Sequence, residues 1–266
     1  MNFYKNKNII KPCIVEFLGT GLITFFGISS LAASKLTNVN LDQFEISCIL
    51  GLGVSISIYL SRTISGAHLN PAITIFFWLS SKFNKKKVLP YIVSQIFGSF
   101  FFTMLIYFLY NNLLTSFERE NNIIRGTQDS INLAAIFCIY PNKNNSFIHN
   151  SIIEIFTTAI FMMILLEFNN KKHNYFLHYN SISPILIGIL VFMINIVISP
   201  LNNISLNPAR DLGPKIFLSL IGWGFLSFTG ENNFLYSLIP MLGPILGANL
   251  GGLIHKMLFS NYFMKK

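Results

Sequence analysis

Charged residues are scarce in this sequence of 266 residues. Asp, Glu, Lys and Arg together make up 11%, and only ten residues are acidic. Soluble domains usually carry about 25% charged residues, so this composition argues against an ordinary soluble protein. The hydrophobic fraction is 52%, and the mean hydropathy is +0.56. We therefore expect a membrane protein.

Cysteine and metal-ligand clusters are scarce as well. The three cysteines, Cys13, Cys48 and Cys138, have neither metal-ligand spacing nor the pattern of a disulfide framework. His68 has no second ligand at a suitable spacing, so its backbone carbonyl is expected to matter more than its ring. No nucleophile with a base is visible, and we expect no enzymatic activity and no cofactor.

Long apolar runs are abundant. About 20 apolar residues cross the roughly 30 Å of hydrocarbon as a helix. Six runs fit this requirement or come close to it: residues 12–34, 46–61, 88–110, 147–166, 182–199 and 234–254. The longest polar stretch, residues 111–145, is expected to form an external loop. The lipid bilayer is the expected environment of the whole chain.

The basic residues are distributed unevenly between the two sides of the membrane that these spans define. Six spans return both termini to one side, and thirteen basic residues fall on that side: Lys5, Lys7, Lys11, Arg62, Lys82, Lys85, Lys86, Lys87, Lys171, Lys172, Lys256, Lys265 and Lys266. Four fall on the other: Lys35, Arg119, Arg125 and Lys143. The positive-inside rule predicts cytoplasmic termini. The net charge of +9 thus reflects topology, and no nucleic acid partner is expected.

A glutamate and an asparagine recur at nearly the same spacing in the two halves of the chain. Glu16 precedes Asn70 by 54 residues, and Glu154 precedes Asn207 by 53. Three spans per half require the second copy to enter the membrane from the opposite face. We expect one transmembrane domain, residues 1–266, built from inverted repeats at 11–110 and 147–258. The expected fold is all-α, with six transmembrane helices and two re-entrant half-helices.

The half-helices are expected at two Asn-Pro-Ala motifs. These are Asn70, Pro71 and Ala72 in the first half and Asn207, Pro208 and Ala209 in the second. Asn is a favoured N-cap and Pro a favoured first helical residue, so each motif starts a helix. The first helix, at 71–80, spans half a membrane, and residues 63–69 descend to it as irregular backbone. Pro214 is expected to distort the second after two turns.

Two helix N-termini that meet at the midplane create a positive potential that repels cations. The amides of Asn70 and Asn207 remain able to donate hydrogen bonds to a neutral solute, and this interrupts proton hopping along a file of water. Arg210, in the first turn of the second half-helix, is expected to face a wet cavity and supply donors at its narrowest ring. An ion pair with Asp211 or another carboxylate is the alternative role for Arg210.

Glu16 and Glu154 hold equivalent places in the two repeats. A shared structural role is expected, in which each buried carboxylate accepts hydrogen bonds from the N–H groups of an irregular descending segment. The alternative is a proton relay, which would make the protein a proton-coupled transporter.

The stretches SGAHLNPAITI and SLNPARDLGPK, together with the two glutamates, resemble the aquaporin or major intrinsic protein superfamily. Over about residues 11–258 the chain is most similar to the bacterial glycerol uptake facilitators within it. The resemblance implies a homotetramer in the bacterial inner membrane with a pore in each subunit. It implies passage of small neutral solutes such as glycerol and water.

Further residues indicate which solute the channel passes. Tyr110, Asp211, Lys215 and Pro240 match the glycerol-type pattern, and Met241 approximates it. A water-selective channel remains the alternative. The resemblance places a selectivity filter at Leu50, Asn195, Ile204 and Arg210 and lining backbone at Gly66, Ala67, His68, Asn203 and Ser205. Leu50 and Ile204 replace the family's aromatic residues, which predicts a wider constriction.

Overall fold

The computed structural model describes residues 9–169, 179–231 and 234–259, and in these residues every regular element is a helix. Six helices are long: α1 (Ile10–Leu36), α2 (Gln43–Ser61), α4 (Lys85–Glu120), α6 (Phe147–Phe168), α7 (Tyr179–Ile198) and α11 (Ile239–Phe259). Six of the basic residues used for the topology lie outside the described residues: Lys5, Lys7, Lys171, Lys172, Lys265 and Lys266.

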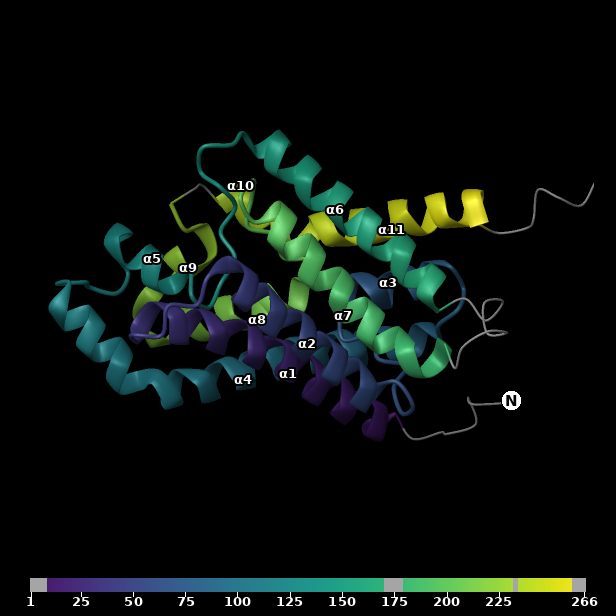
Figure 1. The fold of residues 1–266 in the computed structure, drawn as a ribbon, viewed down its shortest axis with the longest axis horizontal. Coiled ribbons are helices and arrows are strands. Elements are labelled where there is room, and N and C mark those ends of the chain that lie inside the picture. Colours follow the sequence, from purple (N-terminus) through teal and green to yellow (C-terminus); the bar gives the residue numbers. More distant parts are fainter. Residues whose placement is uncertain (1–8, 170–178, 232–233, 260–266) are drawn as a thin grey trace, which may run out of the picture.

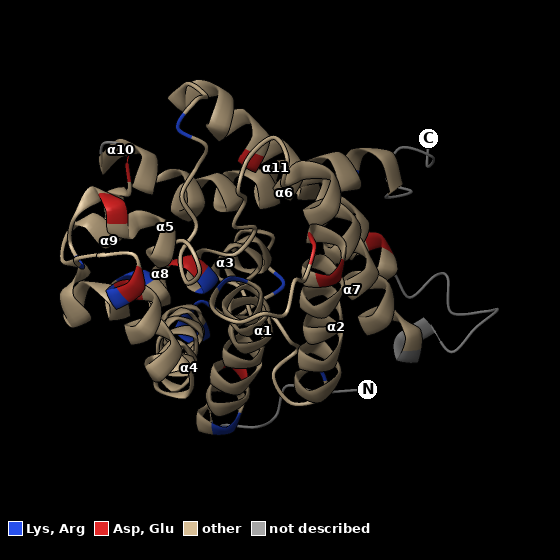
Figure 2. Ribbon diagram, turned by 60° about the vertical axis from the view of Figure 1, so that its left-hand side comes forward, with Lys and Arg blue, Asp and Glu red and all other residues tan. Residues whose placement is uncertain are grey.

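Four of these helices, α1, α2, α4 and α6, are long and apolar enough to cross a membrane. Helix α7 adds the shorter apolar stretch Ile182–Ile198. Helix α11 has 21 residues and is not among these candidate spans. Most of the ribbon carries no charge (Figure 2). The predicted all-α membrane fold is confirmed.

Two predicted boundaries are wrong. The third span continues ten residues past residue 110, to Glu120, because Leu114 is buried and residues 111–120 include no glycine or proline. The short helices η1 (Gln128–Ser130) and α5 (Ile131–Ala134) also lie in the region expected to be loop. The last span begins at Ile239, after the separate helix α10 (Phe234–Ser237), since Pro240 suits the first turn of a helix.

The two half-helices are α3 (Pro71–Leu79) and α8 (Pro208–Leu218). Helix α8 runs four residues beyond Pro214, so the expected distortion after two turns does not end it. The preceding Gly213 packs closely on α4, where a Cβ added to it would lie 2.6 Å from the backbone nitrogen of Phe100. After α8 the chain forms the short π-helix η3 (Ser219–Trp223) and the short α-helix α9 (Leu226–Thr229).

Helix packing is similar in the two halves. Helix α1 lies against α4, α6 lies against α11, and α2 and α7 join the halves. Half-helix α3 contacts α11, and α8 contacts α4, so each docks on a long helix of the opposite half. Helix α1 begins and α11 ends at the same end of the bundle (Figure 1). This arrangement brings the first residues of α3 and α8 to the middle of the bundle.

Candidate functional site

The two half-helices start in the same way. Asn70 and Asn207 have extended backbones, and their side-chain oxygens accept hydrogen bonds from the N–H of Ala72 (2.8 Å) and Ala209 (3.1 Å). Pro71 and Pro208 occupy the first helical turn, where a missing N–H leaves no partner unsatisfied. Local capping rules therefore fix where both half-helices begin.

The two tips are tied directly to each other. Asn70 Nδ2 donates to the carbonyl of Leu206 at 2.8 Å, and Asn207 Nδ2 donates to the carbonyl of Leu69 at 2.8 Å. Each amide nitrogen carries two hydrogens, so one remains for a solute. Both asparagines line the cavity described below, whereas Pro71, Ala72, Pro208 and Ala209 stand behind it.

The segments that descend to the tips have irregular backbone. Positive φ angles occur at Gly66 (89°), Ala67 (50°), Leu69 (50°) and Leu206 (55°). Left-handed φ costs a non-glycine residue energy, and surrounding contacts must hold it. All five residues expected to contribute lining backbone border the cavity: Gly66, Ala67, His68, Asn203 and Ser205.

The contacts that hold these segments come from two buried carboxylates. Glu16 accepts hydrogen bonds from the N–H of His68 (3.0 Å) and Leu69 (2.6 Å). Glu154 accepts from Ser205 (3.0 Å) and Leu206 (2.8 Å). Each glutamate thus accepts hydrogen bonds from buried N–H groups of an irregular segment, which have no partner in a regular helix. These contacts favour the bracing role over a proton relay.

The sequence did not indicate the residues that support Glu16. Gln95 donates to Glu16 at 2.7 Å and to Thr74 Oγ1 at 3.0 Å. The His68 ring lies 3.2 Å from Thr74 Oγ1 and packs among the rings of Phe77, Phe83 and Tyr91. This aromatic packing holds the His68 ring in place, and the expected role of its backbone carbonyl in the passage stays a prediction.

One cavity of about 490 Å³ borders the tips. Its lining includes Gln43, at the first residue of α2, and Arg62, just past its last, so it follows the whole helix. Nineteen helical residues extend about 28 Å, close to the thickness of the hydrocarbon core. The predicted filter residues Leu50, Asn195, Ile204 and Arg210 all line the cavity.

Arg210 is 7% exposed, and its Nη1 has no partner among the described residues. The alternative role, an ion pair with Asp211, does not occur in the described part of the chain: Asp211 pairs with Lys215. A Cβ added at Gly27 would lie 3.9 Å from Arg210 Nη2 and 3.2 Å from Leu50 Cδ1. Gly27 therefore leaves space beside the arginine.

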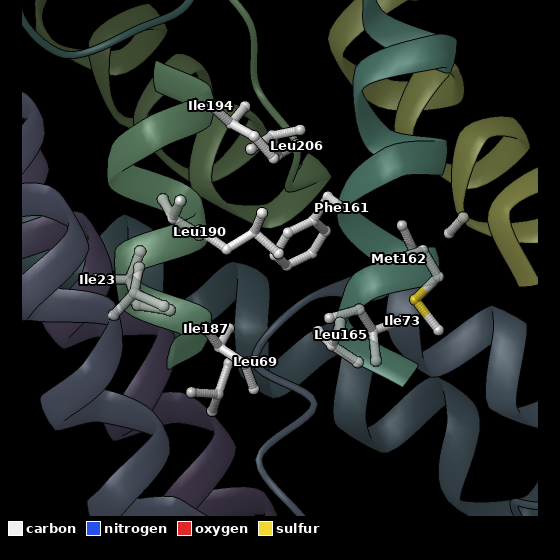
Figure 3. Packing of buried hydrophobic residues seen from close by; sticks show 14 of the residues in the cluster. Ile23, Leu69, Ile73, Phe161, Met162, Leu165, Ile187, Leu190, Ile194 and Leu206 are labelled. Carbon is white, nitrogen blue, oxygen red and sulfur yellow. The ribbon is translucent and has the colours of Figure 1, made fainter. Parts of the chain in front are cut away.

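One wall of the cavity is aliphatic. Buried hydrophobic side chains from α1, α6, α7 and both descending segments face one another there (Figure 3). Members of this cluster that also line the cavity are Ile23, Val54, Leu69, Ile73, Phe161, Leu165, Ile187, Val191, Ile204 and Leu206. The hydrophobic core thus also lines the cavity.

The region expected to be an external loop contributes to the cavity. Ala135, Cys138 and Ile139 are among its lining residues, and the N–H of Ile139 donates to Asp211 at 2.8 Å. The sequence signal for this contribution was the apolar stretch INLAAIFCIY inside a polar region. Cys138, to which we assigned no role, is therefore a buried lining residue with a free thiol.

A buried ion pair lies within α8, at the aspartate that accepts from Ile139. Lys215 Nζ lies 2.6 Å from Asp211 Oδ2, and both side chains are 0% exposed. Lys215→Met would leave the carboxylate buried without its partner, so we expect a loss of about 3–5 kcal/mol in unfolding free energy. Thermal unfolding in detergent measures the loss. Adding Asp211→Asn should restore part of it, and an unchanged melting temperature in the single variant would contradict the prediction.

Known proteins share this architecture. Residues 3–255 match the model of the major intrinsic protein family. The chain is 72% identical to a glycerol uptake facilitator protein of Buchnera aphidicola, covering 98% of this chain and 100% of the relative. It is 44% identical to the glycerol uptake facilitator protein of Escherichia coli, over 94% of this chain and 88% of that one. The aquaglyceroporin of Plasmodium falciparum superposes with a TM-score of 0.80 at 26% identity, covering 94% and 97%. The chain belongs to the major intrinsic protein family.

Proposed function

We propose that the chain is a passive channel for glycerol and similar small neutral solutes. The carrying observation is a cavity whose lining combines the donors of Asn70, Asn207 and Arg210 with many aliphatic side chains. Glycerol has hydroxyls along one edge and a carbon chain along the other, so it can contact both kinds of group. The glycerol uptake facilitators among the relatives support the same class of solute.

Ions are excluded by electrostatics in this proposal. Each half-helix contributes about half a positive charge at its N-terminus, and Arg210 adds a full charge nearby. Asn70 and Asn207 hold a passing oxygen with donors, so a water between them has no lone pair free to take up a proton. Neutral solutes are not repelled by these charges, and they do not depend on proton transfer between waters.

Glycerol flux tests the proposal. Vesicles containing the protein, exposed to a glycerol gradient, should swell faster than empty vesicles. Gly27→Leu should remove most of this increase, because the added side chain would occupy the space beside Leu50 and Arg210. Leu52→Phe, which adds bulk on α2 at a side chain 58% exposed and outside the cavity lining, is the matched control. Swelling at the rate of empty vesicles would reject the proposal. Fast water flux without glycerol flux would favour the water-selective alternative.

We also propose the topology and assembly. The basic residues of the short connections support a topology in which α1 begins and α11 ends on the cytoplasmic side of the inner membrane. The segments 11–110 and 147–258 are proposed as the inverted repeats, supported by the matching contacts of Glu16 and Glu154. A homotetramer is proposed as the working assembly, with a complete pore in each subunit.

A further inference from the structure

Residues 121–139, which follow α4, are fastened near both ends of half-helix α8, and we call this segment the strap. At one end, the N–H of Ile139 donates to Asp211, in the first turn of α8, at 2.8 Å. At the other, Arg125 Nη1 donates at 3.2 Å to the carbonyl of Ile221, which lies in η3 just past the end of α8. The strap thus holds the half-helix of the second Asn-Pro-Ala motif at both ends.

The Arg125 side chain joins the strap to α4 as well. Its Nε and Nη2 donate to the two carboxylate oxygens of Glu118 at 2.6 and 3.1 Å, and its Nη1 donates to the hydroxyl of Tyr107 at 2.9 Å. The guanidinium carbon lies 4.8 Å from the ring centre of Trp223 in η3. A bidentate arginine–carboxylate pair fixes the direction of both side chains, and a cation over an aromatic ring adds attraction. One residue therefore ties together α4, the strap and the segment after α8.

The backbone beside Arg125 allows this close contact. Gly222 has a φ of 113°, and a Cβ added there would lie 3.4 Å from the Cβ of Arg125. Gly126 has a φ of 83°, and a Cβ added there would lie 3.0 Å from the carbonyl oxygen of Gly222. Left-handed φ angles favour glycine, so both positions let the strap and η3 approach each other. Trp223, 1% exposed, adds a hydrogen bond to the carbonyl of Ser130 in the strap at 3.3 Å.

Hydrophobic packing connects the Arg125 end of the strap to the end that lines the cavity. Leu218 of α8 and Trp223 of η3 belong to a buried cluster that includes the strap side chains of Ile131, Leu133, Ala134, Ile136, Phe137 and Cys138. Cys138 and Ile139, at the end of this packed stretch, line the same cavity as Arg210. A change in the fastening at Arg125 can therefore reach the cavity wall through a packed segment.

We propose that Arg125 is a positioning residue of the pore and that Glu118 directs it. Their ion pair keeps the strap seated on α8, and the seated strap holds Cys138 and Ile139 in the wall of the cavity. Without the pair, the strap leaves α8 part of the time, and the thiol of Cys138, only 2% exposed in the seated strap, becomes accessible to solvent. The inference rests on the proposed channel function, because the wall in question is that of the proposed pore.

The labelling rate of Cys138 tests the inference. The protein with Cys13→Ser and Cys48→Ser carries only this thiol, and a sulfonated maleimide too bulky for the pore is the probe. Arg125→Met removes the fastening, and we expect labelling roughly tenfold faster, the order that one lost charge-assisted hydrogen bond gives to a local opening. Glu118→Gln keeps the shape of its side chain and weakens the pair, so the increase should be smaller. Arg125→Lys restores the charge without the bidentate contact and should reverse part of the increase.

Two controls separate a local opening from a general loosening of the fold. Arg119→Met makes the same chemical change at an exposed arginine next to Glu118 on α4, and its labelling rate should equal that of the unmodified protein. A companion protein with Cys13→Ser and Cys138→Ser keeps Cys48, which lies on α2. Arg125→Met should leave the labelling rate of Cys48 unchanged. If Arg125→Met does not fold, Glu118→Gln decides.

Glycerol flux is measured in vesicles that contain the same proteins. It should persist in Arg125→Met before labelling and fall once Cys138 carries the probe. An unchanged labelling rate of Cys138 in both Arg125→Met and Glu118→Gln, an equal rise at Cys48, or flux unaffected by the bound probe would overturn the inference alone. A protein that passed no glycerol even without substitution or label would instead reject the proposed function, on which the inference rests.

Discussion

Vesicles carrying Arg210→Val are expected to leak protons. Arg210 is the buried charge beside the first turn of α8, and valine removes it while the half-helix remains. A unit charge about 6 Å from a proton contributes roughly 3 kcal/mol at an effective dielectric constant of about 20, or about a hundredfold in rate. A pH-sensitive dye inside the vesicles measures the proton flux after an acid pulse.

Arg210→Lys is the matched control. It retains the charge at the same place, so proton exclusion should largely persist, although the planar donor array is lost. Glycerol flux should continue in both variants, which separates loss of exclusion from loss of the pore. Equal proton leakage in Arg210→Val and the unmodified protein would show that the half-helix termini alone exclude protons.

Removing the Glu154 carboxylate should destabilise the protein strongly. Glu154→Ala leaves the N–H groups of Ser205 and Leu206 buried without partners. Each such group costs about 1–3 kcal/mol, so we expect a loss of roughly 2–6 kcal/mol in unfolding free energy. The measurement is thermal unfolding in detergent. Glycerol flux should fall as well, because the second descending segment loses its brace.

Glu16→Gln separates bracing from proton coupling. Glutamine keeps one acceptor oxygen for the N–H groups of His68 and Leu69, so part of the bracing survives. It cannot relay a proton. Downhill glycerol flux should therefore persist in this variant. If flux required a pH difference and disappeared in Glu16→Gln, the coupled-transporter alternative would hold instead.

Local rules made the half-helices predictable from the sequence. N-capping by Asn70 and Asn207 and the prolines that follow depend only on neighbouring residues, and α3 and α8 begin at those positions. The spans were predictable because apolar length is a property of a single segment. Their ends were less so: Leu114 continues α4 because its side chain is buried by other parts of the fold.

Apart from the contacts of Glu16 and Glu154 with the descending segments, which the repeat suggested, contacts between distant residues could not be predicted. Ile139 reaches Asp211 across 72 positions, and Asn195 reaches Ser47 across 148. Neither pairing leaves a periodic or spacing signal in one sequence. The mutual bonds of Asn70 and Asn207 with Leu206 and Leu69 are of the same kind. Sequence reasoning placed the tips together, but the atoms that join them come only from the fold.

Tracer glycerol uptake tests the central claim most directly. Vesicles are loaded with buffer, given labelled glycerol outside, and followed to equilibrium with and without an imposed pH difference. A passive pore past Asn70 and Asn207 predicts rapid uptake that ends at equal inner and outer concentrations in both conditions. Uptake no faster than in empty vesicles, or accumulation above the outer concentration when the pH difference is present, would contradict it.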